Sequence, residues 1–247
     1  MKKIISFIVM LCMILTFTIT SYAETDDYQK LPFIWMNTEE EITEDDWYYS
    51  AACHIWEDYD SLFSFKFSPT RQVKRIELAA YMTSLDHEWT WFMSKFEANP
   101  FTDLESYSNN RRVLEIIDWA YNFDIIEGIS ETEFSPDGYL TREQLAVFMY
   151  RLSNHFLSYD KLTDDYAKID VTVKASIDAF PDASEVSDFA VEAMEWAYGT
   201  ELMIGKGTPD GVLLSPKDTL THAELMNVMY RYTLYFTVDL SNSIIVI

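Results

Sequence analysis

The chain is short of cysteine, glycine and proline, and these shortages exclude two classes of protein. Its 247 residues hold two cysteines, Cys12 and Cys53, and Cys12 lies in the apolar run near the N-terminus. The remainder of the chain therefore cannot form an internal disulfide, which excludes a disulfide-held scaffold. Six glycines and seven prolines are too few for an all-β protein with many tight turns.

Basic residues are also scarce, with 18 lysines and arginines against 41 acidic residues and a formal charge of −23. Nucleic acids and anionic lipid surfaces are poor partners for a protein with such a large negative charge, because like charges repel. The Asp-Gly fragments lack the alternating ligands of a calcium loop. We expect no metal and no cofactor, because metal-ligand spacing is absent among the four histidines, His54, His87, His155 and His222.

The N-terminus has the composition of a secretory signal peptide. Lys2 and Lys3 precede an apolar run over residues 4–19, and Ala23 ends a small-x-small cleavage site. The alternative is an uncleaved membrane anchor, but the run is short for a span. We predict a secreted protein with no membrane contact after cleavage. Loss of residues 1–23, with two lysines and no acid, would leave a charge of −25.

One sequence frame occurs three times. The frame is clearest in residues 134–151, FSPDGYLTREQLAVFMYR, and recurs in residues 214–231, LSPKDTLTHAELMNVMYR. A degenerate copy occupies residues 67–82, FSPTRQVKRIELAAYM. Each copy has an aromatic residue or Leu, then Ser-Pro, a turn, a polar patch and an apolar helical run. Recurrence of this kind indicates a repeat protein.

Each repeat is predicted to be helix, loop, turn, helix. The first helices carry apolar stripes at i, i+3, i+4 and i+7. These are Val113, Ile116, Ile117 and Ala120 in repeat two, and Ala190, Ala193, Met194 and Ala197 in repeat three. The second helices begin at Thr141 and Thr221. One unit cannot bury both apolar faces alone, so we expect three units to share one core.

The predicted organisation has seven segments along the chain. These are a signal peptide (1–23), an acidic leader (24–41), a degenerate repeat one (42–98), repeat two (99–156), a linker (157–178), repeat three (179–238) and a tail (239–247), read as a strand or docking segment.

The ordered motifs resemble the S-layer homology domain. They are Phe-x-Asp, Trp-Ala, Gly, Phe-Ser-Pro-Asp-Gly and a Thr-Arg patch. In repeat two they are Phe101, Asp103, Trp119, Ala120, Gly128, Phe134, Ser135, Pro136, Thr141 and Arg142. In repeat three they are Phe180, Asp182, Trp196, Ala197, Gly205, Ser215, Pro216, Thr221 and Glu224. Repeat one keeps only Ser68, Pro69, Arg75, Glu77 and the helical pattern.

The resemblance implies an all-α fold in which three repeats share one pseudo-threefold helical bundle. It also implies that grooves between repeats bind the secondary cell-wall polymers of Gram-positive bacteria, often through a pyruvylated sugar. The implied role is non-covalent anchoring at the cell wall, with cell-wall polysaccharide and other surface proteins as partners. The alternative is a surface protein–protein interaction module with decayed glycan grooves.

Catalysis is not expected. A glycosidase needs two opposed carboxyl groups, but the acidic residues are spread along the chain and no catalytic segment lies outside the repeats. We therefore predict a binding protein and not an enzyme.

The resemblance places glycan binding on nine residues: Arg142, Arg75, Asp103, Trp119, Gly128, Asp182, Trp196, Gly205 and His222. Arg142 is the most informative, because a cation in the first helical turn opposes the helix dipole. The sequence shows no structural reason for it. Either a neighbouring acid or a bound carboxylate, held also by free helix-start amides, could offset the cost.

The other predicted residues have structural alternatives. Thr141 with Gln144, and Thr221 with Glu224, form capping boxes. Each tryptophan either stacks on a sugar or lies in the core, and each aspartate either binds ligand or caps a turn or helix.

The two glycines either adopt a positive φ or allow close approach of a ligand. His222 stands where repeats one and two have arginine. We predict that the repeat-three patch binds wall glycan weakly, because neutral imidazole is a poor carboxylate ligand.

Overall fold

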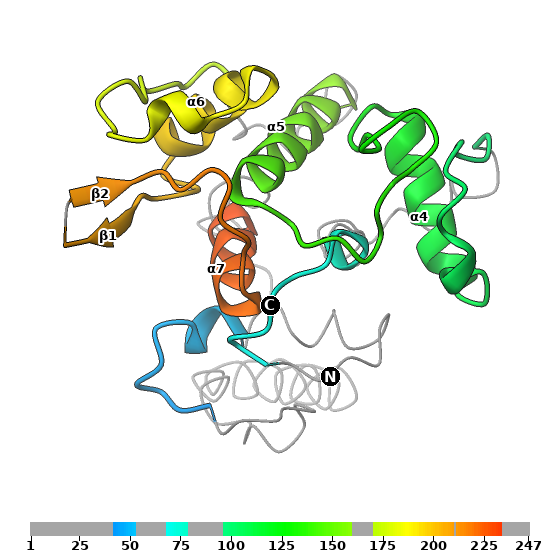
Figure 1. The fold of residues 1–247 in the computed structure, drawn as a ribbon, viewed down its shortest axis with the longest axis horizontal. Helices are drawn as coiled ribbons and strands as arrows, with labels where there is room; N and C mark the ends of the chain where they lie inside the picture. Colours follow the sequence, from blue (N-terminus) through cyan, green and yellow to red (C-terminus); the bar gives the residue numbers. More distant parts are fainter. Residues whose placement is uncertain (1–41, 53–67, 79–95, 160–169, 210, 234–247) are drawn as a thin grey trace, which may run out of the picture. The chain divides into compact units, whose positions relative to one another are not determined.

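The structure is a computed structural model that describes residues 42–52, 68–78, 96–159, 170–209 and 211–233 (Figure 1). All of these residues belong to one compact unit. The predicted signal peptide, leader and tail lie outside the described residues, which begin at residue 42, the predicted start of repeat one. Cys53, His54 and His87 also lie outside them.

Repeat two contains the 3-10 turn η4 (Glu105–Tyr107) and the helices α4 (Arg111–Asn122) and α5 (Arg142–Tyr159). Asn110 caps α4, because its side chain accepts a hydrogen bond from the Val113 N–H at 3.3 Å. The predicted apolar stripe of α4 is buried along its whole length. Helix α5 continues to Tyr159, three residues into the segment predicted as linker.

Repeat three contains two 3-10 turns, two helices and a β-hairpin. In chain order these are η7 (Ala183–Glu185), η8 (Asp188–Ala190), α6 (Val191–Gly199), β1 (Lys206–Thr208), β2 (Gly211–Leu213) and α7 (His222–Tyr232). Thr208 pairs with Gly211 in the antiparallel hairpin. Gly211 has φ +127°, which glycine adopts without steric cost. The fold is rich in helix, but the hairpin corrects the expectation of an all-α chain.

One part of the core lies between α5 and α6. Helix α5 packs along α6 (Figure 1). It is joined to α7 by a buried hydrogen bond of 3.0 Å between the hydroxyl groups of Ser153 and Tyr232. The predicted apolar face of α5 is buried, as its residues Leu145, Phe148, Met149 and Leu152 show.

The three Ser-Pro turns meet in a closed ring of backbone hydrogen bonds. The Val73 N–H donates to the Leu220 carbonyl at 2.9 Å, Leu220 donates to Leu140 at 3.0 Å, and Leu140 donates to Val73 at 2.8 Å. All three side chains are fully buried. These residues occupy the same position in the three sequence repeats, so the ring joins the repeats with threefold order.

The helix starts form a second cyclic set of hydrogen bonds, which runs round the three repeats in the opposite direction. The first N–H groups of a helix have no acceptor within the helix. Here the turn of the next repeat supplies the acceptors. At the first helical residue, the N–H group of Arg75 donates to the Gly138 carbonyl, that of Arg142 to the Asp218 carbonyl and that of His222 to the Arg71 carbonyl, at 2.8 to 2.9 Å. At the second helical residue, the N–H group of Ile76 donates to the Pro136 carbonyl, that of Glu143 to the Pro216 carbonyl and that of Ala223 to the Pro69 carbonyl, at 3.0 to 3.1 Å.

The third N–H group of each helix is satisfied locally. Thr221 and Glu224 form the predicted capping box. The Thr141 hydroxyl likewise accepts from the Gln144 N–H, while the Gln144 side chain accepts from the Thr141 N–H. Repeat one has Lys74 at this position. The Glu77 N–H therefore bonds to the Lys74 carbonyl instead, at 3.0 Å.

Candidate functional site

Arg75 joins repeat one to repeat two from a buried position. Its Nε donates to the Phe134 carbonyl at 2.9 Å and its Nη2 donates to the Glu127 carbonyl at 3.0 Å. The guanidinium also lies over the Phe134 ring, 4.8 Å from its centroid. Burial lowers the pKa of Arg75 to about 10, against a raising effect of Asp103. Arg75 therefore stays charged at neutral pH and holds the repeat-two loop.

Arg142 makes the equivalent contacts between repeats two and three. Its Nε donates to the Leu214 carbonyl at 2.9 Å and its Nη2 donates to the Ile204 carbonyl at 2.7 Å. Burial lowers its pKa, opposed by three nearby carboxylates. The expectation that Arg142 lacks a structural role is wrong, because two charge-assisted hydrogen bonds offset the unfavourable helix dipole. The helix-start amides expected to be free are bonded to the next turn.

His222 lies at the third junction, between repeats three and one. Its ring is fully buried, and its Nε2 lies 3.1 Å from Oε2 of the equally buried Glu77. Arg71 approaches the other Glu77 oxygen at 2.9 Å. Burial raises the pKa of Glu77, but the bonds from His222 and Lys74 and the charge of Arg71 outweigh it and hold the pKa below its usual value. Weak glycan binding by this patch stays a prediction.

Asp103 and Asp182 each hold a Ser-Pro turn. Asp103 accepts from the N–H groups of Phe134 and Ser135 at 3.0 and 2.7 Å, and Asp182 accepts from those of Leu214 and Ser215 at 2.9 and 2.7 Å. Ser135 has φ +60° and Ser215 has φ +51°, a strained region for a serine. The two carboxylates therefore stabilise left-handed turn residues, which supports the turn-cap alternative.

The predicted tryptophans and glycines also support the structure. Trp119 and Trp196 are 4% and 0% exposed, so neither indole offers a face to a sugar. Neither Gly128 nor Gly205 has a positive φ, so that alternative is wrong. A Cβ on Gly128 would lie 2.4 Å from the Glu133 carbonyl oxygen. Close approach of the backbone therefore requires glycine at position 128, whereas a Cβ on Gly205 would meet the exposed Val212 side chain at 2.4 Å.

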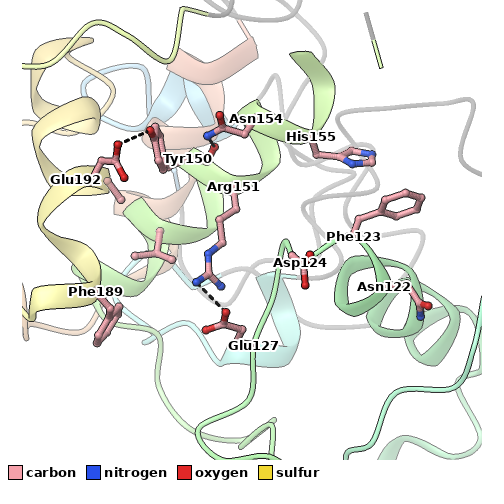
Figure 2. A pocket seen from close by; sticks show the side chains of 12 residues that line it. Asn122, Phe123, Asp124, Glu127, Tyr150, Arg151, Asn154, His155, Phe189 and Glu192 are labelled. Atoms are coloured by element: carbon pink, nitrogen blue, oxygen red, sulfur yellow. Dashed lines mark hydrogen bonds and ion pairs between the residues drawn. The ribbon is translucent and has the colours of Figure 1, made fainter. Parts of the chain in front are cut away.

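A separate cleft of about 620 Å³ lies between α4, α5 and α6 (Figure 2). Its α5 wall has residues spaced i, i+3, i+4, i+7 and i+8, which places them on one helical face. These residues are Val147, Tyr150, Arg151, Asn154 and His155. Figure 2 shows Phe189 and Glu192 on one side and Asn122 and Phe123 on the other. None of the nine predicted glycan residues lines this cleft.

Arg151 lies at the centre of the cleft. Its Nη2 pairs with Oε1 of Glu127 at 3.0 Å, and 28% of its side chain is exposed (Figure 2). Arg75 bonds the main-chain carbonyl of this same Glu127. The buried arginine thus positions a residue whose side chain contributes to the cleft.

Sequence reasoning missed Arg151, although a signal was available. The tripeptide Met-Tyr-Arg ends the repeated stretch in both repeat two and repeat three, as residues 149–151 and 229–231. The second copy differs in its contacts, because Arg231 donates to the Leu202 carbonyl at 3.4 Å.

On the side formed by α6, a short polar chain connects three residues. The Tyr150 hydroxyl donates to Oε1 of Glu192 at 3.1 Å, and Lys174 Nζ approaches the same oxygen at 2.5 Å. The bond from Lys174, followed by that from Tyr150, lowers the pKa of Glu192. Glu192 is therefore ionised at neutral pH.

His155 lies at the opposite end of the cleft, with its ring 4.4 Å from Phe123 and 5.5 Å from Trp119. Burial lowers the pKa of His155 to about 4. The imidazole is therefore neutral at physiological pH and adds no positive charge to the cleft.

Neither a metal-binding cluster nor a membrane-spanning helix occurs among the described residues. In those parts of the chain, no three His, Cys, Asp or Glu side chains are grouped so that they could hold a metal ion. No helix among the same residues is long and apolar enough to cross a bilayer.

Comparison with known families gives a direct match. The sequence model of the S-layer homology domain matches residues 100–146 and 179–226, which contain the turns and helix starts of repeats two and three. These two segments are S-layer homology repeats. S-layer homology domains indicate a surface protein that is anchored to the cell wall. Residues 68–78 lie outside both matches, yet they complete the backbone ring with the two S-layer homology repeats.

A curated relative shares much of the chain. An endoglucanase of Bacillus sp. (strain KSM-635) is 27% identical over 163 residues, which are 66% of this chain but only 15% of the relative. The chain thus spans a small part of that protein's length. The S-layer homology domain is a binding module, and the similarity to the endoglucanase shows no enzymatic domain in this chain.

Proposed function

We propose that this protein is secreted and attaches non-covalently to a Gram-positive cell wall by binding the secondary cell-wall polymer. The observation that carries the proposal is the match of repeats two and three to the S-layer homology domain. The ring closed by residues 73, 140 and 220 supports treating repeat one as a divergent third copy, with all three repeats forming one binding unit. A pyruvylated sugar is the proposed acidic unit of the polymer, as the family resemblance implies.

The binding surface in this proposal includes the cleft between α4, α5 and α6, which lies between the two matched repeats. The strongly negative chain cannot attract an anionic polymer through its net field, so the binding must be local. Arg75 and Arg142 act as positioning residues in this scheme. They fix the loops that carry Glu127 and Ile204, in the same way that the two aspartates fix the turns.

Co-sedimentation with purified Gram-positive walls tests the proposal. The full chain should pellet with intact walls and stay in solution after the secondary polymer is stripped. An unrelated protein of similar acidity controls for trapping in the pellet. Equal pelleting before and after stripping would contradict polymer binding.

A protein–protein interaction role is the second candidate, and one observation favours it. The anion site expected at the helix starts is filled, because Arg142 and the first helical amides donate to carbonyls of the neighbouring repeat. Binding that survives removal of the polymer but is lost after protease treatment of the wall would support this candidate.

A further inference from the structure

The cleft between α4, α5 and α6 differs in chemistry from a site for an acidic ligand. We infer that it binds an uncharged, hydroxyl-rich sugar unit of the wall polymer, and that the acidic unit is held elsewhere. This inference rests on the proposed function and specifies which part of the polymer the cleft takes.

The charges of the cleft oppose an anionic ligand. Three carboxylates line it, those of Asp124, Glu127 and Glu192, against one guanidinium, that of Arg151. Arg151 is already paired with Glu127. Lys174, which is not part of the lining, pairs with Glu192. The three carboxylates still exceed the two cations, so the cleft keeps an excess of negative charge. A sugar carboxylate placed here would face like charges at short range.

The hydrogen-bonding groups of the cleft are mostly acceptors. Asn122 uses both of its amide N–H groups, on the Asp118 and Glu97 carbonyls at 2.7 and 2.8 Å, and Asn154 uses one of its two, on the Tyr150 carbonyl at 2.8 Å. The Tyr150 hydroxyl donates to Glu192. The two amide oxygens and the carboxylates thus remain to accept. Sugar hydroxyl groups supply donors, whereas a carboxylate supplies only acceptors.

Two aromatic side chains provide apolar surface on opposite sides of the cleft. Phe189 is 62% exposed and Phe123 is 37% exposed, which is unusual for phenylalanine (Figure 2). The C–H faces of a pyranose ring are apolar and match an aromatic ring, while its hydroxyl groups point to the rim. Aromatic walls with a few oriented polar groups are typical of small-ligand sites.

Calorimetric titration with purified secondary polymer tests this inference, using native polymer and polymer whose acidic ketal groups have been removed by mild acid. We expect Phe189→Ala to weaken binding of both forms about tenfold, through lost stacking. Val212→Ala is the control, because Val212 is exposed on the hairpin and lies outside the cleft. Its binding should match that of the unchanged chain.

Each other outcome has a distinct meaning. An effect of Phe189→Ala that is present with native polymer and absent with the acid-free form would place the acidic unit in the cleft and overturn the inference. No effect on either form, or loss of all binding to the acid-free form, would also overturn it. Failure of the unchanged chain to bind native polymer would instead refute the proposed function.

A second variant pair tests the charge argument. Asp124→Asn keeps a residue that tolerates the φ of +56° at this position, and Glu127→Gln removes the partner of Arg151. Both should weaken binding of native and acid-free polymer alike, by roughly a few-fold, because each removes a charged acceptor for sugar hydroxyl groups from the cleft. A several-fold gain for native polymer alone would show that these carboxylates had been repelling an acidic unit in the cleft.

Discussion

The junctions between repeats one and two and between repeats two and three use arginine, whereas the junction between repeats three and one uses a histidine–glutamate pair. Arg75 and Arg142 each donate to two backbone carbonyls of the next repeat. His222 instead contacts the buried carboxylate of Glu77. The backbone hydrogen bonds are nevertheless the same at all three junctions. Turn geometry therefore sets the ring, and the side chain at the helix start sets the chemistry of each junction.

The use of arginine or of a histidine–glutamate pair determines how strongly a substitution at each junction destabilises the fold. An arginine stays protonated at any physiological pH and needs only fixed carbonyls as partners. A buried carboxylate depends on its charged or hydrogen-bonding partners, because losing one leaves an uncompensated charge. The third junction should therefore be the most sensitive of the three to a single substitution.

Glu77→Ala should have the largest effect on stability. It removes the partner of both His222 and Arg71 in a fully buried position, and breaking such a pair costs about 3–5 kcal/mol. Urea unfolding measures the loss. Glu224→Ala is the matched control at the equivalent helix position, where the side chain is partly exposed and caps α7, and should cost about 1 kcal/mol. Equal losses would contradict the special role of the third junction.

Arg142→Met and Arg75→Met should have intermediate and similar effects. Each leaves two carbonyls without their donor, and a buried unsatisfied group costs about 1–3 kcal/mol. We expect a loss of about 2–4 kcal/mol for either variant in the same unfolding experiment. If only one of the two destabilises the fold, the first two junctions are not equivalent.

His155→Gln should have the smallest effect, and only in acid. The folded His155 has its pKa lowered from 6.5 to about 4, so between these values the unfolded chain binds more protons. The free energy of unfolding therefore falls as the pH drops from 6.5 to 4. We expect this residue to account for about 1–2 kcal/mol of that fall, allowing for its partial exposure.

Urea unfolding at pH 7 and pH 4 tests the His155 prediction. The unchanged chain should lose more stability across this interval than the variant. His155 lies outside the ring, so the variant should keep the sensitivity to Glu77→Ala. An identical pH dependence in both proteins would show that His155 is not held neutral by burial.

Local features of the fold could be predicted from the sequence, and tertiary partners could not. The apolar stripes of α4 and α5 and both capping boxes depend on residues within one turn or two of each other, and the structure confirms them. The partners of Arg142 are main-chain carbonyls 62 and 72 residues away, and any residue type can supply a carbonyl. Its structural role was therefore invisible in the sequence.

The cleft shows a different limit on what can be predicted from the sequence. Arg151 stood in the repeated Met-Tyr-Arg tripeptide, so its recurrence was visible, but its pairing with Glu127 depends on how the loop after α4 is placed. The hairpin of repeat three was missed because each strand has three residues, too few for an alternating pattern to show.

The ring of turns also fixes how many repeats the unit can hold. Each turn accepts hydrogen bonds from one helix start, and the first two N–H groups of each helix donate to one turn. With three repeats, every turn and every helix start therefore has a partner. An open solenoid grows by stacking another repeat on its end, whereas this ring has no end on which to stack. At the junction between repeats three and one, Val73 bonds to Leu220, and the side chains of Gln72 and Thr219 bond across 147 positions. Forming this junction is therefore the most non-local step of folding. A truncated chain that lacks one turn would leave both neighbouring repeats with unpaired backbone groups.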